Sequence, residues 1–163
     1  MNVGITGHQD LGGSETARWV AEAISAALDR VNVTKGLTCL AKGADQLYAQ
    51  ILQDRHLPYV AVIPCKQIEA SFSTEEDITL FRRLRTAAAE TVTLPFDAPS
   101  ETAYFEAGKA VVDRSELIIA VWNGLPAKGL GGTADVVKYA LDTAKPVVHI
   151  NLTSHTVHNL GNK

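Results

Sequence analysis

Three glycine-containing loops hold most of the side chains in this sequence that could bind a ligand. They span residues 7–13, 42–45 and 124–133, and we call them the first, second and third loops. Glycine lets backbone N–H groups approach an anion closely, and a helix that begins after such a loop adds a favourable partial charge. The loops therefore indicate an anion site of the kind that binds phosphate groups.

The third loop is the best candidate for the phosphate site, because Gly131 and Gly132 precede Thr133 at an expected helix start. Backbone N–H groups and the Thr133 hydroxyl would then face the anion. His8 directly follows an expected strand and is placed to hydrogen-bond a phosphate or a base. The residues expected to bind ligand are Gly7, His8, Gln9, Gly12, Lys42, Gly43, Asp45, Trp122, Asn123, Gly131, Gly132 and Thr133.

Several of these side chains have a second interpretation. Asp45 is equally suited to cap the helix that follows it, since aspartate is a preferred cap. Trp122 either stacks on a base or packs against a neighbouring helix. Asp10 is acidic close to the first loop's glycines, which disfavours a phosphate there and favours a ribose hydroxyl.

Short apolar runs alternate with helical patterns along the chain, and they would position these loops. The six expected strands are Val3–Thr6, Gly36–Ala41, Tyr59–Ile63, Thr91–Leu94, Leu117–Trp122 and Pro146–Ile150. Strict alternation predicts a single α/β domain of Rossmann-like type, with a parallel sheet of about six strands and helices on both faces. We place the domain at residues 1–152 and expect residues 153–163 to form a flexible polar tail.

In such a sheet the three loops fall on one edge, at the carboxyl ends of the strands, where open α/β sheets bind ligands. The loops match neither common nucleotide motif. The chain has no G-x-x-x-x-G-K-[ST], no G-x-G-x-x-G after the first strand and no acidic residue closing the second strand. A P-loop enzyme and a dinucleotide-dependent dehydrogenase are therefore disfavoured, and no cofactor is expected.

Composition excludes several partners. The 163 residues carry a net charge of −3, which does not suggest a positively charged surface that binds nucleic acid. The apolar runs are far shorter than a membrane span, and the start MNVGITG does not resemble a signal peptide, so we expect a cytoplasmic protein. His155 and His158 lack further ligands for a metal site. Hydrophobic sheet edges and helix stripes favour a homo-oligomer.

Three segments resemble one family. Gly7-His8, residues 40–45 (Leu-Ala-Lys-Gly-Ala-Asp) and residues 131–135 (Gly-Gly-Thr-Ala-Asp) are similar to motifs of the SLOG superfamily, over about residues 3–150. That grouping includes the lonely-guy phosphoribohydrolases and the DprA-like and YpsA-like proteins. The resemblance implies a Rossmann-like domain that binds a nucleotide or nucleotide-derived ligand, with phosphate in the third loop.

The sequence leaves two functions open. The first is a binding or sensor module for a nucleotide. The second is a nucleotide N-glycosidase, or a transferase of the deoxyribosyl type to which residues 113–140 bear a looser similarity, with Asp135 as the catalytic carboxylate. Glu101 and Glu106 are the candidates for a general acid. A purely structural subunit would leave the glycine loops unexplained.

Overall fold

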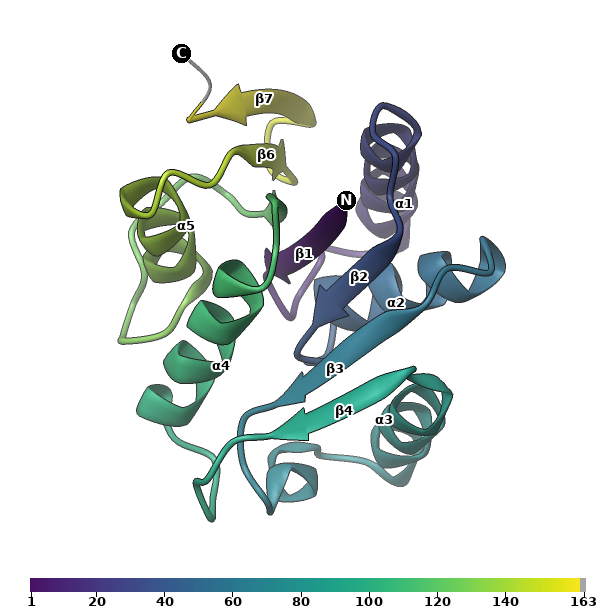
Figure 1. Ribbon diagram of the computed structural model, residues 1–163, viewed down its shortest axis with the longest axis vertical. Coiled ribbons are helices and arrows are strands. Elements are labelled where there is room, and N and C mark those ends of the chain that lie inside the picture. The colour runs from purple at the N-terminus through teal and green to yellow at the C-terminus, as the bar shows by residue number, and fades with distance from the viewer. Residues whose placement is uncertain (162–163) are drawn as a thin grey trace.

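The computed structural model describes residues 1–161, which form a seven-stranded sheet with helices on both faces (Figure 1). The helical elements are α1 (Ser14–Asp29), α2 (Ala44–Asp54), the short 3-10 helix η1 (Ile68–Ser71), α3 (Glu75–Ala87), α4 (Glu101–Asp113) and α5 (Thr133–Asp142). The strands are β1 (Asn2–Gly7), β2 (Lys35–Thr38), β3 (Tyr59–Ile63), β4 (Glu90–Thr93), β5 (Leu117–Val121), β6 (Val147–Asn151) and β7 (Thr156–Leu160).

The strand order is β4-β3-β2-β1-β5-β6-β7, and β1 to β6 are parallel. The chain builds outward from β1 through β2 and β3 to β4, then returns to the other side of β1 with β5. The order therefore reverses between β1 and β5. Ligands of open α/β sheets bind outside the carboxyl ends of the strands at such a point.

Two hydrophobic layers hold the helices to the sheet. Residues of α1, α2 and α3, including Ile24, Tyr48 and Phe81, pack on one face. Residues of α4 and α5, including Val111 and Val137, pack on the other. The interior strands β3 and β5 are buried along their whole length, as the near-continuous apolar runs predict for a parallel sheet covered on both faces.

The prediction of an α/β Rossmann-like sheet is confirmed, with two corrections. The sheet has seven strands rather than about six, and the last pair is antiparallel. The additional strand β7 lies in the segment that we expected to form a flexible tail. It was missed because its first four residues, Thr156 to Asn159, are exposed and carry no apolar alternation.

The N-cap of α3 lies one residue after the position that a capping-box pattern in the sequence indicates. Ser73 and Glu76 have the spacing of a capping box, but the cap is Thr74, whose side chain accepts a hydrogen bond from the Asp77 N–H at 3.1 Å. The helix therefore begins one residue later than the sequence pattern indicates. At the start of α4, Ser100 is the cap, and its side chain accepts a hydrogen bond from the Ala103 N–H at 3.0 Å.

Candidate functional site

A cleft of about 1060 Å³ lies at the reversal point between β1 and β5. The first loop continues β1 and forms one wall, and the third loop continues β5 and forms another. Of the residues expected to bind ligand, those lining the cleft are Gly7, His8, Gln9, Gly12, Asp45, Trp122, Asn123, Gly131, Gly132 and Thr133. The fold thus brings together residues more than 120 positions apart in sequence.

His8 ties the first and third loops together. The ring Nε2 accepts a hydrogen bond from the Asn123 backbone N–H at 3.1 Å. The backbone N–H of His8 donates to the Val121 carbonyl at 3.0 Å. Because a backbone N–H can only donate, Nε2 carries no proton in this arrangement and the ring is neutral with its proton on Nδ1. The histidine therefore sets the spacing of the two walls and leaves Nδ1–H without a partner in residues 1–161.

The third loop is held at both ends by hydrogen bonds. The Trp122 indole N–H donates to the Leu125 carbonyl at 2.8 Å, and the Asn123 Oδ1 accepts from the Leu125 N–H at 2.9 Å. At the other end, an Asp135 carboxylate oxygen accepts from the Gly131 N–H at 3.0 Å. These bonds keep the loop in place before any ligand arrives.

Gly131 is required by the close approach of this loop to α4. Its φ is +86°, and a Cβ there would lie 2.8 Å from the Glu101 carbonyl oxygen. A side chain would push the loop away from the start of α4 and change the shape of the cleft. Gly131 thus shapes the wall of the cleft through its packing on α4.

The N-terminus of α5 borders the cleft and has free backbone N–H groups. The N–H groups of Gly132, Thr133 and Ala134 form no hydrogen bond within residues 1–161. The three residues line the cleft. Free N–H groups at the first turn of a helix, together with the helix dipole, favour a bound anion.

The second loop contributes less than expected. Lys42 pairs with Asp77 of α3 at 3.4 Å and does not line the cleft. Gly43 does not line it either: its φ is +90°, and a Cβ would collide with the Gln9 carbonyl oxygen. Gly43 instead allows the second loop to pack against the first, where the Ala44 N–H donates to the His8 carbonyl at 3.2 Å.

Asp45 is a buried carboxyl at the floor of the cleft, with 6% of its surface exposed. One carboxylate oxygen accepts from the Ala41 N–H at 3.3 Å, so the side chain turns back to the residues before α2. Burial raises the pKa of Asp45 to about 7, and the hydrogen bonds from the Ala41 and Cys39 backbone oppose that rise. This carboxyl is therefore substantially protonated near neutral pH.

Trp122 packs on a strand and also lines the cleft. Its ring lies 4.9 Å from the His149 ring at an angle of 37°, so it packs against β6. It is only partly buried and also lines the cleft. The ring is thus fixed by its neighbours while part of its surface faces the space where a ligand would lie.

The charged groups that line the cleft are mostly acidic. Asp10 and Glu101 line it together with the buried Asp45, and among residues 1–161 Lys128 is the only Lys or Arg in the lining. An anionic group in this cleft therefore depends on backbone N–H groups more than on side-chain cations. Asp135 is absent from the lining, since its carboxylate is turned to the Gly131 N–H.

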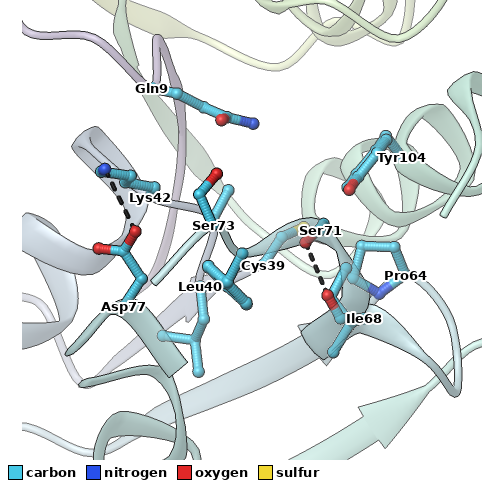
Figure 2. Close-up of a pocket in the computed structure, with 12 residues that line it drawn as sticks. Gln9, Cys39, Leu40, Lys42, Pro64, Ile68, Ser71, Ser73, Asp77 and Tyr104 are labelled. Carbon is cyan, nitrogen blue, oxygen red and sulfur yellow. Dashed lines mark hydrogen bonds and ion pairs between the residues drawn. The ribbon is translucent and has the colours of Figure 1, made fainter. Parts of the chain in front are cut away.

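A second cavity of about 380 Å³, the side pocket, opens beside the cleft (Figure 2). The two cavities share Gln9, Cys39, Ala41 and Tyr104 in their linings. Residues 64–73, which follow β3, form much of its wall, and they were not expected to bind ligand. A signal existed, because this irregular segment also leaves a strand at the carboxyl edge of the sheet.

Within residues 1–161, no group of three or more His, Cys, Asp or Glu side chains is arranged to hold a metal ion. In the same part of the chain, no helix is both long and apolar enough to cross a membrane. The thiols of Cys39 and Cys65 are free.

Comparison with known proteins gives fold-level relatives only. No family model and no curated protein sequence matches the chain. Among solved structures, DNA processing protein A (DprA) from Streptococcus pneumoniae superposes with a TM-score of 0.64 at 16% identity, over 91% of this chain and 49% of DprA. This chain therefore spans about half the length of DprA.

Two further structures are of molybdenum cofactor proteins. The carrier protein from Chlamydomonas reinhardtii gives a TM-score of 0.55 at 16% identity, over 92% of this chain and 76% of the carrier. The binding protein from Rippkaea orientalis gives 0.50 at 18% identity, over 91% and 74%. At these identities the likeness concerns the fold alone: the chain has the Rossmann-like fold of these structures, as the resemblance seen in the sequence implies.

Proposed function

We propose that this protein binds a nucleotide or a nucleotide-derived ligand in the cleft between β1 and β5, with an anionic group of the ligand at the N-terminus of α5. The observation that carries the proposal is the set of free N–H groups of Gly132, Thr133 and Ala134 lining a large cleft at the reversal point of the sheet. That the fold-level relatives include molybdenum cofactor proteins supports ligand binding by this fold.

Binding is favoured over N-glycosidic bond cleavage by the position of Asp135. A carboxylate that stabilises or attacks an oxocarbenium-like centre must reach the sugar. The Asp135 carboxylate holds the third loop through Gly131 and does not line the cleft. Incubation with nucleoside 5′-monophosphates followed by chromatography separates the two functions, because a binding protein releases no free base.

Thr133→Pro tests the anion site. Proline is well tolerated at the first position of a helix, and Gly132 before it is extended, with φ −69° and ψ 170°. The change removes the free Thr133 N–H and the hydroxyl. Because a hydrogen bond to a charged group contributes about 1.5–3 kcal/mol, we expect affinity for the best ligand to fall at least about tenfold.

The measurement is isothermal titration calorimetry with AMP, GMP, CMP, UMP, ADP-ribose and a cyclic dinucleotide. Thr133→Ser is the matched control, since it keeps both the N–H and the hydroxyl and should bind within about twofold of the wild type. Circular dichroism checks that each variant is folded. Equal affinity of Thr133→Pro and the wild type would place the anion elsewhere, and no binding by the wild type would reject the proposed function.

A further inference from the structure

The side pocket lies at the same edge of the sheet as the cleft and has no role in the proposed function. It lies beyond the ends of β2 and β3, between η1 and the start of α3. Gln9, Cys39, Ala41 and Tyr104 border both the side pocket and the cleft, so one molecule can extend from one space into the other.

The lining of the side pocket is mixed, with apolar surface beside polar groups that are mostly uncharged. Leu40, Pro64, Ile68 and Phe72 supply apolar surface. The side chains of Gln9, Ser73 and Tyr104 form no hydrogen bond within residues 1–161, and Figure 2 shows them around the same space. Apolar surface beside free, uncharged polar groups suits a flat heterocycle with hydrogen-bonding edges.

The charges around the side pocket disfavour a phosphate group. Its one cation, Lys42, pairs with Asp77, as Figure 2 shows. Asp77 is joined by Glu75 and Glu76 in the first turn of α3, so three carboxylates lie at the helix end that would otherwise attract an anion. Burial keeps the Cys39 thiol protonated by raising its pKa, with the nearby Asp45 adding to the rise.

We propose that the side pocket is a second subsite that takes the uncharged heterocyclic base of the ligand, while the anionic group lies at the N-terminus of α5. This rests on the proposed function, since it divides one ligand between the cleft and the side pocket. In this arrangement the ligand is recognised at two chemically different ends, one by apolar surface and neutral hydrogen-bonding side chains and the other by a set of backbone N–H groups.

The test compares two kinds of probe, which share a phosphate and differ in whether they carry a base. Ribose 5-phosphate lacks the base that AMP, GMP, CMP and UMP carry. Ser73→Trp fills the side pocket with an indole, and Thr86→Trp adds the same indole at an exposed position of α3 outside both cavities. Affinities for all five probes are measured by calorimetry with the full chain.

In the wild type and in Thr86→Trp, we expect at least one nucleotide to bind about tenfold or more tightly than ribose 5-phosphate, because a base on apolar and aromatic surface adds affinity of that order. In Ser73→Trp the ratio of the nucleotide affinity to the ribose 5-phosphate affinity should fall to about two or less, while the affinity for ribose 5-phosphate itself stays unchanged. An unchanged ratio would show that the base lies elsewhere. Loss of ribose 5-phosphate binding would show that the pocket holds the phosphate.

The two proposals fail in different ways. If the wild type binds none of these probes and none of the larger nucleotides, the proposed function itself is wrong. If nucleotides bind and Thr133→Pro weakens them while Ser73→Trp leaves the base preference intact, only the side-pocket assignment is wrong. If circular dichroism shows that Ser73→Trp is unfolded, Ser73→Met replaces it, because methionine fills the same position with a smaller, flexible side chain. The same results are then expected of Ser73→Met.

Discussion

Asp45 shows how the environment of one side chain changes its chemistry. The position follows a glycine turn and begins a helix, which in sequence suggests a cap or a ligand contact. In the structure its carboxyl is buried, receives the Ala41 N–H and has a pKa raised to about 7 by burial. The side chain therefore titrates in the neutral range although it is an aspartate.

This shift predicts a pH dependence of stability. Asp45 has an ordinary pKa of 3.8 and a folded-state pKa of about 7, so between these values the folded state keeps a proton that the unfolded state releases. Raising the pH through this window therefore favours unfolding, and above the folded pKa the contribution is constant. Asp45→Asn keeps an oxygen for the Ala41 N–H and removes the titration.

The free energy of unfolding of the wild type, measured in urea, should fall relative to that of Asp45→Asn by more than about 1 kcal/mol between pH 4.5 and pH 7. Asp54→Asn, at an exposed position on the same helix, should leave the wild-type dependence unchanged. Parallel pH profiles for wild type and Asp45→Asn would show that the buried carboxyl has no shifted pKa.

Single-residue roles were the least predictable from sequence. The cleft lining includes ten of the twelve residues expected to bind ligand, but not Lys42 or Gly43. Gly43 is a glycine because another chain segment crosses it, and Lys42 has a carboxylate partner from α3. A sequence pattern indicates that a position needs glycine or a charge, but the neighbour that imposes the need comes from distant elements.

At the scale of elements, the start of α3 illustrates how a local signal can be displaced by one residue. Ser73 and Thr74 are adjacent and both have an acidic residue three positions later. The backbone of Thr74 is extended and its hydroxyl accepts the Asp77 N–H, whereas Ser73 lies outside the helix. Two adjacent capping patterns cannot be separated by residue type alone.

The two residues offer a matched pair of variants. Thr74→Ala removes the cap and should lower the free energy of unfolding by about 1 kcal/mol. Ser73→Ala, next to it and equally exposed, should change it by less than about 0.5 kcal/mol. Urea unfolding at one pH provides both values, and the opposite order would restore Ser73 as the cap.

For the whole molecule, alternation of strands and helices was sufficient to predict the layers and the edge that carries the loops. Predicting the reversal between β1 and β5 requires the strand order, which six similar apolar runs do not specify. The order matters for function, because it places the first loop beside the third and leaves the second loop against the first. Assembly into a homo-oligomer stays a prediction.

The last strand decides where the domain ends. β7 pairs with β6 at five positions, from Val147–Leu160 to Asn151–Thr156. Before it, His155 stacks on Trp19 of α1 with ring centroids 4.5 Å apart, and Leu160 packs against the core that α4 and α5 cover. If this strand is part of the folded unit, a chain ending at Thr153 loses the ladder and leaves β6 as an edge.

That truncation should lower the free energy of unfolding by about 2 kcal/mol or more, because each ladder hydrogen bond contributes roughly 0.5–1.5 kcal/mol net. It should also aggregate more readily with concentration, since a β6 edge with the buried Val147 and Ile150 becomes available for pairing. Urea unfolding and light scattering measure the two effects, with removal of residues 162–163 alone as the control. A truncated chain as stable as the full chain would mean that residues 154–163 add nothing to the domain, whereas the expected loss would extend the folded unit to Leu160.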